Sequence, residues 1–162
     1  MKRIIVTGAN KGIGLGIVRR LLSEYDETFL ILAARSLERA EQSASLLLDE
    51  NKAWKNRLIT LKLDVELDDS VAEASEKICS VFDGISEPIH CLINNAGVGD
   101  SYLGMQRVLD VNTWGVKRVC KAFLPLISKK QGRIVNVTSA SGPNFVAKCE
   151  ANSKYILTNP NV

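Results

Sequence analysis

Continuous apolar runs alternate along the chain with segments in which apolar residues recur at helical spacing. The runs predict five buried strands at 3–6, 28–33, 57–63, 89–93 and 134–137. Because these strands lack polar alternation and a helix separates each from the next, they predict a parallel sheet with helices on both faces. With right-handed crossovers, this is an α/β doubly wound parallel sheet in strand order 3-2-1-4-5.

The segments between the strands predict helices. The first begins among the glycines after residue 6, and Ser36 is predicted to cap a second that runs to about Asp49. A third opens at Asp68 or Asp69, and its inward side chains are predicted to be Val71, Ala74, Ile78, Val81 and Phe82. A single long helix is predicted over 105–127, with an inward face of Val108, Val111, Val119, Phe123 and Leu126.

The periodic pattern stops after Gly142. We therefore expect a Rossmann-type domain at 1–142 and an irregular tail at 143–162, with at most one short helix around 148–157. Residues 158–161, Thr-Asn-Pro-Asn, indicate a turn.

Composition narrows the class of protein. The chain has 162 residues, 46% of them hydrophobic and 24% charged, which is typical of one globular domain. A net charge of +3, dispersed along the sequence, argues against nucleic acid or a membrane surface as a partner. The four cysteines form no C-x-x-C pair, so we expect neither disulfides nor a metal site, and we expect a cytoplasmic protein.

A glycine-rich stretch follows the first strand. Gly8, Gly12, Gly14 and Gly16 fall within nine residues, where a helix begins. The free N–H groups at a helix start attract phosphate, and glycine lets a ligand approach the backbone closely. The stretch therefore predicts a nucleotide site, and the alternative is a tight turn without a ligand. Its spacing is G-x-x-x-G-x-G, unlike the G-x-G-x-x-G of the usual dinucleotide motif.

Further polar clusters follow the other strands. Asp64-Val65 follows the third strand, Asn94-Asn95-Ala96-Gly97 the fourth, and Thr138-Ser139 the fifth. The carboxyl ends of parallel strands lie at one edge of the sheet, and ligands bind there, where the strand order reverses. The clusters are therefore expected to lie close together.

These motifs, in this order, resemble those of the short-chain dehydrogenase/reductase family, and within it the carbonyl reductases. The matching residues are Thr7-Gly8-x-x-x-Gly12-x-Gly14, Asp64-Val65, Asn94-Asn95-Ala96-Gly97, Asn112, Gly115 and Ser139, together with the run Gly132–Val137. The resemblance covers nearly the whole chain.

The resemblance implies an NADP(H) cofactor. The implied cofactor-binding residues are Gly8, Asn10, Lys11, Gly12, Ile13, Gly14, Arg35, Asp64, Val65, Asn94, Ala96 and Gly97. An NAD site keeps an acidic residue after the second strand, whereas this chain has Arg35 there and no carboxylate before Glu38. Arg35 and Lys11 suit a 2′-phosphate, although both could instead be solvated surface charges.

The resemblance also implies a catalytic tyrosine with a lysine four residues later, a serine and an asparagine. Ser139 and Asn112 match the serine and the asparagine, but no Tyr-x-x-x-Lys occurs in the chain. Tyr155 is a poor substitute, because Asn159 stands four residues later and Pro160 follows. The tail resembles the start of a carbonyl-reductase insertion, so the chain looks truncated before the tyrosine. Between Gly97 and Asn112 the chain is shorter than the family pattern, in which a longer loop and helix start are usual, and this leaves the register of Asn112 open.

We therefore expect an NADP(H)-binding protein of carbonyl-reductase type that is inactive or weakly active alone. Its substrate would be a small carbonyl compound. One alternative is an active oxidoreductase that takes its acid from the tail or from a partner chain. The other is a non-catalytic nucleotide-binding or regulatory module. We also expect a homo-oligomer, formed through the exposed edge of the strand at 134–137 and uncovered helices.

Overall fold

The computed structural model describes residues 1–99 and 104–159. Its parallel sheet has five strands in the order β3-β2-β1-β4-β5, as predicted. The strands are β1 (Lys2–Val6), β2 (Thr28–Ala34), β3 (Leu58–Lys62), β4 (Cys91–Asn94) and β5 (Arg133–Asn136). β1 is central, and its Val6 pairs with Leu32 on one side and Ile93 on the other.

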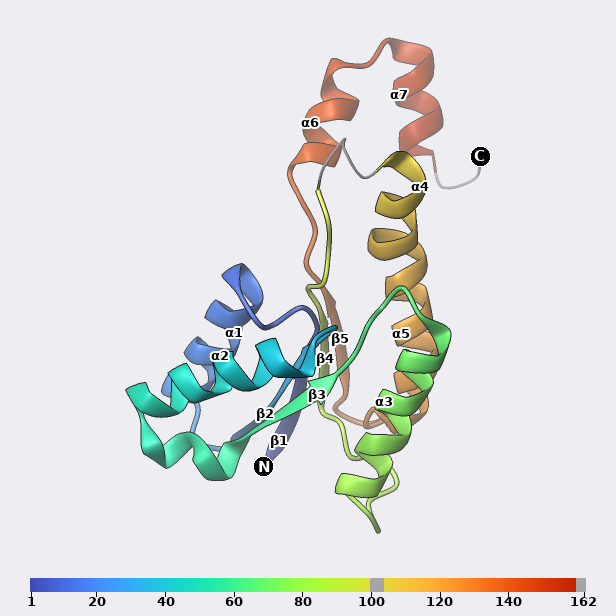
Figure 1. Ribbon diagram of the computed structural model, residues 1–162. Coiled ribbons are helices and arrows are strands. Elements are labelled where there is room, and N and C mark those ends of the chain that lie inside the picture. The colour runs from blue at the N-terminus through green and yellow to red at the C-terminus, as the bar shows by residue number, and fades with distance from the viewer. Residues whose placement is uncertain (100–103, 160–162) are drawn as a thin grey trace.

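Helices cover both faces of the sheet, as the absence of polar alternation predicted. The helices are α1 (Gly12–Glu24), α2 (Leu37–Glu50), α3 (Asp68–Val81), α4 (Gly104–Leu109), α5 (Val116–Phe123), α6 (Ser141–Lys148) and α7 (Ala151–Thr158). In Figure 1, α1 and α2 lie on one face and α3 and α5 on the other, with α6 and α7 beyond the carboxyl ends of the strands. Among the described residues, no helix combines the length and apolar content that crossing a membrane requires.

Alternate residues of the strands divide the core into two layers. Ile4 and Val6 pack with Leu22 and Leu47 on the side of α1 and α2. Ile5, by contrast, packs with Ile78 and Phe123 on the side of α3 and α5. This alternation follows from the two-residue repeat of a strand and accounts for the apolar runs in the sequence.

Arg57 holds the carboxyl end of α1. It is the last residue of the 3₁₀ helix η1 (Lys52–Arg57), and its guanidinium donates to the carbonyl oxygens of Leu22 (2.8 Å), Tyr25 (2.9 Å) and Thr28 (3.4 Å). Only 11% of this side chain is exposed. The last turn of a helix has carbonyls without partners in the helix, and Arg57 supplies donors to two residues of that end.

Ser36 caps α2 as predicted, because its hydroxyl accepts a hydrogen bond from the N–H of Arg39 at 3.3 Å. The prediction that Val81 faces inward on α3 is wrong, since 42% of that residue is exposed. Phe82 instead covers this end of the sheet, edge-on to Phe29 with ring centroids 5.7 Å apart.

The long helix predicted over 105–127 corresponds to an unbroken helical run over 104–126, but this run is not α-helical throughout. A π-helical segment, η3 (Asp110–Gly115), separates α4 from α5, and a 3₁₀ turn, η4 (Leu124–Leu126), ends the run. Pro125 explains the ending, because proline has no N–H for the helical hydrogen bond.

An irregular tail was predicted, and this prediction is wrong as well. Residues 141–158 form α6 and α7, of which only α7 falls in the range predicted for a short helix. Neither helix buries a residue, and Phe145 and Tyr155 are 65% and 61% exposed. An apolar periodicity marks a helix face that packs on a core, so two exposed helices leave little trace in the hydrophobic pattern.

Candidate functional site

The glycine turn joins the end of β1 to the start of α1 with very little room. Gly8 has a positive φ of 63°, which favours glycine, and a Cβ there would lie 2.8 Å from the Cα of Ala96. At Gly14, a Cβ would lie 2.5 Å from the side-chain nitrogen of Asn95. The turn therefore packs directly against the segment that follows β4.

Thr7 and Asn95 fasten the turn to that segment. The Thr7 hydroxyl oxygen accepts hydrogen bonds from the N–H groups of Asn95 and Ala96, each at 3.0 Å. In return, the Asn95 amide nitrogen donates to the carbonyl oxygen of Thr7 at 2.9 Å and to that of Gly8 at 3.4 Å. Thr7 is buried, so its hydroxyl oxygen finds its hydrogen-bond partners within the protein.

A cavity of about 390 Å³ opens beside the turn at the carboxyl ends of the strands. It is lined by Gly8, Asn10, Lys11, Gly12, Ile13, Gly14, Arg35, Ser36, Arg39, Leu63, Asp64, Val65, Glu66, Asn95, Ala96, Gly97, Val98 and Val111. Every residue predicted to bind the cofactor is in this lining except Asn94. The structure thus brings together the segments that follow four strands, β1, β2, β3 and β4, which are far apart in the sequence.

Asn94 points elsewhere. Its amide nitrogen donates to the Asn136 side-chain oxygen at 2.9 Å and to the Cys120 sulfur at 3.3 Å, so the side chain lies between β4, β5 and α5. Neighbouring Asn95, which the sequence analysis left out of the predicted site, reaches the glycine turn. The motif contains both asparagines, but a motif alone does not say which of two successive side chains faces the ligand.

One part of the cavity lining is basic. Lys11, Arg35 and Arg39 line it, and none of them forms an ion pair with a described residue. Arg39 was missed by the sequence analysis, although it stands one helical turn after Arg35. Three unpaired cations in a concave site favour an anionic ligand.

The two carboxylates in the lining already have partners. Arg107 lies against Glu66, with 3.2 Å between Nε and Oε1. Asp64 accepts a hydrogen bond from the N–H of Glu66 at 3.1 Å. Neither forms an ion pair with one of the three basic residues, which leaves their charge available.

The start of α1 also suits an anion. No side chain caps this helix, and its first turn has no acidic residue. The unpaired N–H groups of a first turn bind phosphate well, helped by the helix dipole. Because Gly12, Ile13 and Gly14 of this turn line the cavity, a phosphate in the cavity could reach those groups.

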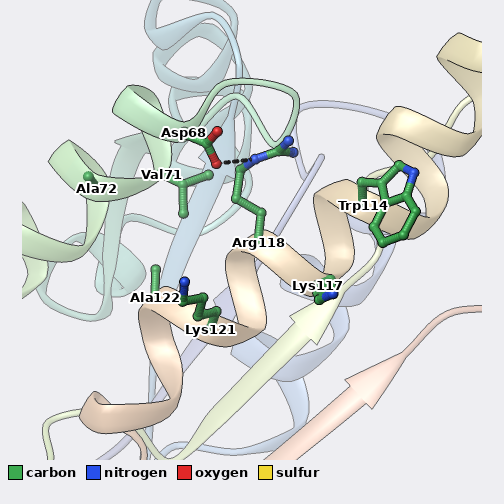
Figure 2. A pocket seen from close by; sticks show the side chains of 8 residues that line it. All are labelled: Asp68, Val71, Ala72, Trp114, Lys117, Arg118, Lys121 and Ala122. Atoms are coloured by element: carbon green, nitrogen blue, oxygen red, sulfur yellow. Dashed lines mark hydrogen bonds and ion pairs between the residues drawn. The ribbon is translucent and has the colours of Figure 1, made fainter.

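Arg118 links the cavity to a second hollow. This hollow has a volume of about 480 Å³ and lies between α3 and the helical run of η3 and α5. Figure 2 shows its lining residues, among them Trp114 of η3 and Lys117 of α5. Arg118 pairs there with Asp68, and its guanidinium also donates to the carbonyl oxygen of Val65 at 2.6 Å. Val65 lines the cavity beside the glycine turn, so Arg118 positions one of its walls.

Replacing Arg118 by alanine is expected to weaken adenine nucleotide binding by about threefold to tenfold, because the loop at Val65 loses a charge-assisted hydrogen bond. Titration with 2′-phospho-AMP measures the change. Lys117→Ala is the matched control, since Lys117 lies over the Trp114 ring at 5.2 Å and is absent from the lining beside the turn. Equal losses in both variants would contradict the role of Arg118.

The residues matched to catalysis lie outside the cavity lining. Asn112, in η3, holds the backbone of Val98, accepting from its N–H at 2.8 Å and donating to its carbonyl at 2.7 Å. Ser139 is exposed and donates to the Ser141 hydroxyl at 3.0 Å. Asn112 therefore shapes the wall through Val98, whereas Ser139 lies in the connection from β5 to α6.

Tyr155 is on α7, is 61% exposed and is not among the residues that line the cavity. His90, the sole histidine in the sequence, precedes β4. Burial, Arg133 and Lys2 lower the pKa of His90, so its imidazole is neutral at pH 7. Neither residue lies where it could transfer a proton at the cavity.

Comparisons with known proteins agree with this geometry. A family model described as short chain dehydrogenase matches residues 2–155. The chain is 34% identical over 148 residues to the mitochondrial D-beta-hydroxybutyrate dehydrogenase of Bos taurus, covering 87% of this chain and 42% of that one. It is 31% identical over 152 residues to carbonyl reductase [NADPH] 1 of Mus musculus, covering 90% of this chain and 51% of that one. The chain thus spans about half the length of the curated relatives it matches.

Solved structures share the fold. An alcohol dehydrogenase from the archaeon Thermococcus sibiricus, complexed with 5-hydroxy-NADP, superposes with a TM-score of 0.73 at 30% identity, covering 98% of this chain and 65% of that one. Menthone neomenthol reductase from Mentha piperita superposes with a TM-score of 0.76 at 24% identity, covering 96% of this chain and 71% of that one.

Proposed function

The chain belongs to the short-chain dehydrogenase family, and we propose on that basis that it binds NADP(H) in the cavity beside the glycine turn. The observation that carries this proposal is the group of three cations in the lining, Lys11, Arg35 and Arg39, which have no ion-pair partner within residues 1–99 and 104–159. A site for NAD needs a carboxylate at the end of β2 for the ribose hydroxyls. Here β2 ends at Ala34 and is followed by Arg35 and Ser36.

Each part of the lining suits one part of this cofactor. The uncapped start of α1 suits the pyrophosphate, and the three cations suit the 2′-phosphate. Asp64 and Val65 would contact the adenine, while Ala96 and Gly97 would line the path toward the nicotinamide. Two of the similar proteins support NADP(H) as the cofactor. The Mus musculus relative is named carbonyl reductase [NADPH] 1, and the Thermococcus sibiricus alcohol dehydrogenase was solved with 5-hydroxy-NADP.

We propose that the reaction for which this site is built is the reduction of a carbonyl compound. When bound, NADPH would supply a hydride to the carbonyl carbon. The oxygen then needs a proton and hydrogen-bond donors, for which Ser139 is the candidate donor and Asn112 the candidate relay residue. The chain has no tyrosine with a lysine four residues later, and Tyr155 lies away from the cavity. We therefore propose that this chain alone binds the cofactor without using it efficiently.

The purified chain is expected to bind NADPH but to reduce quinones and aromatic ketones at no more than a trace rate. Binding is followed by the change in NADPH fluorescence, and turnover by the loss of absorbance of the reduced nicotinamide. A chain that binds NADPH and turns over at an ordinary rate would contradict the proposed lack of a proton donor. A folded chain that does not bind NADPH would contradict the proposed cofactor.

For the compartment, we propose the cytoplasm. All four cysteines are free, which suits a reducing environment. The Bos taurus relative is a mitochondrial protein by its name, so the family occurs in more than one compartment.

A further inference from the structure

Ser43 places a hydroxyl on the inward side of α2. The buried residues of this helix are Ala40, Ser43, Ala44 and Leu47. Ser43 is the polar residue of this set, and only 7% of its surface is exposed. Alanine and leucine fill such positions without a hydrogen-bond partner, whereas a buried hydroxyl needs one. Packing against the core alone therefore does not account for a serine at this position.

The Ser43 hydroxyl has partners on two different elements. It donates to the carbonyl oxygen of Arg39 at 2.9 Å, four residues earlier, which is a bond that serine commonly forms within a helix. The same hydroxyl lies closer, at 2.7 Å, to the carbonyl oxygen of Asn10 in the glycine turn. Ser23 of α1, by contrast, is exposed and donates to Arg20 of its own helix. Ser43 thus joins α2 to the glycine turn.

This contact bridges the two sides of the basic part of the cavity lining. Lys11 follows Asn10 in the turn, whereas Arg35 follows β2 and Arg39 belongs to α2. A phosphate held from both sides requires a fixed separation between them, because charge-assisted hydrogen bonds form over a narrow range of distances. Ser43 contacts Arg39 itself and the residue before Lys11, so it limits this separation.

A backbone hydrogen bond fastens the turn on the same side. The N–H of Ala9 donates to the carbonyl oxygen of Ala33, near the end of β2, at 2.9 Å. Ala9 and Asn10 are successive residues of the turn, so one is held to β2 through the backbone and the other to α2 through Ser43. Of these two contacts, the one from Ser43 depends on a side chain and can be removed by substitution.

We infer that Ser43 is a positioning residue for the 2′-phosphate of the nucleotide. It holds Lys11 and Arg39 at the separation at which both contact one phosphate group. Ser43 is not among the residues that line the cavity, so it acts through these two cations. The inference rests on the proposed NADP(H) site and adds to it a determinant of cofactor preference outside the lining.

Ser43→Ala removes the hydroxyl and preserves the helix, because alanine is the best helix former. The variant is expected to lower the ratio of 2′-phospho-AMP affinity to AMP affinity by about threefold to tenfold, because the hydrogen bond that orders the two cations is lost. The affinity for AMP is expected to stay unchanged. Calorimetric titration of both nucleotides gives the ratio, and urea unfolding verifies that the variant is folded.

Ser70→Ala is the matched control on another wall of the cavity. Ser70 is 8% exposed, and its hydroxyl accepts a hydrogen bond from the N–H of Asp64 at 2.9 Å. Asp64 lines the cavity at the proposed adenine contact, and both nucleotides contain adenine. Ser70→Ala is therefore expected to weaken the binding of both equally and to leave the ratio unchanged. A fall in the ratio as large as that of Ser43→Ala would indicate a general structural effect and overturn the inference.

A double-mutant cycle with Arg39→Ala tests whether Ser43 acts through the cations. Ser43→Ala is expected to lower the ratio less in the Arg39→Ala background than in the unaltered chain, because residues that act through one another are not additive. Equal reductions in both backgrounds overturn the inference, as does an unchanged ratio in Ser43→Ala alone. An unaltered chain that does not prefer 2′-phospho-AMP over AMP would contradict the proposed NADP(H) site, and the inference with it.

Discussion

Replacing Arg35 by alanine is expected to weaken the binding of 2′-phospho-AMP about tenfold or more, with little change in the binding of AMP. Arg35 lines the basic part of the cavity and forms no ion pair with a described residue. A hydrogen bond between charged groups contributes about 1.5–3 kcal/mol, and 1.4 kcal/mol is a factor of ten. The loss should therefore appear only with the ligand that has the extra phosphate.

Calorimetric titration of the two nucleotides measures the effect. Arg39→Ala and Lys11→Ala are also expected to lower the preference for 2′-phospho-AMP over AMP, since both residues line the same part of the cavity. Arg20→Ala is the control, because Arg20 is exposed and paired with Glu24 at 2.8 Å on the surface of α1. If the unaltered chain bound AMP and 2′-phospho-AMP equally, the proposed preference for NADP would be wrong.

Gly14→Ala is expected to lower the free energy of unfolding by about 1–3 kcal/mol and also to weaken nucleotide binding. The new Cβ would lie 2.5 Å from the Asn95 amide nitrogen and 2.7 Å from the carbonyl oxygen of Gly8. Two backbone segments would have to separate, and overpacking of this kind costs about 1–3 kcal/mol. The separation also breaks the contact between Asn95 and the glycine turn.

Gly16→Ala is the matched control one half-turn further along α1. A Cβ at Gly16 meets nothing within 4 Å, so the alanine adds no clash. It is expected to raise the free energy of unfolding by about 0.5–1 kcal/mol, because alanine favours a helix over glycine. Urea unfolding compares both variants with the unaltered chain. Similar stabilities for the two variants would contradict the close packing of Gly14.

The sequence was sufficient to predict the sheet because its signals were strong and local. After Thr28, the run from Phe29 to Ala33 is apolar throughout, as a strand buried on both faces requires. Ser36 then begins the next helix with a capping hydroxyl. Most of the cavity lining could be predicted for a topological reason. Parallel strands place their carboxyl ends at one edge, so Gly8, Asp64 and Gly97 had to lie close together once the strand order was correct.

The features that could not be predicted depend on where side chains point and on contacts between residues distant in sequence, which no local sequence pattern encodes. Asn94 and Asn95 are neighbours in one motif, yet one side chain holds β5 and the other holds the glycine turn. Arg39 lines the cavity only because of the way α2 lies beside the turn. The π-helical segment around Asn112 accompanies a side-chain contact to Val98, which is distant in sequence and therefore not visible as periodicity.

Arg57 has a consequence for the entropy of binding. Its guanidinium holds the carboxyl end of α1, while Thr7 and Asn95 hold the turn at the other end. A helix fixed at both ends cannot swing, so its first N–H groups keep their direction before any ligand arrives. A phosphate bound there would meet an ordered partner, and less conformational freedom would be lost on association than a loose loop would lose. Arg57 would thus favour binding at the start of α1 although it contacts the opposite end of the helix.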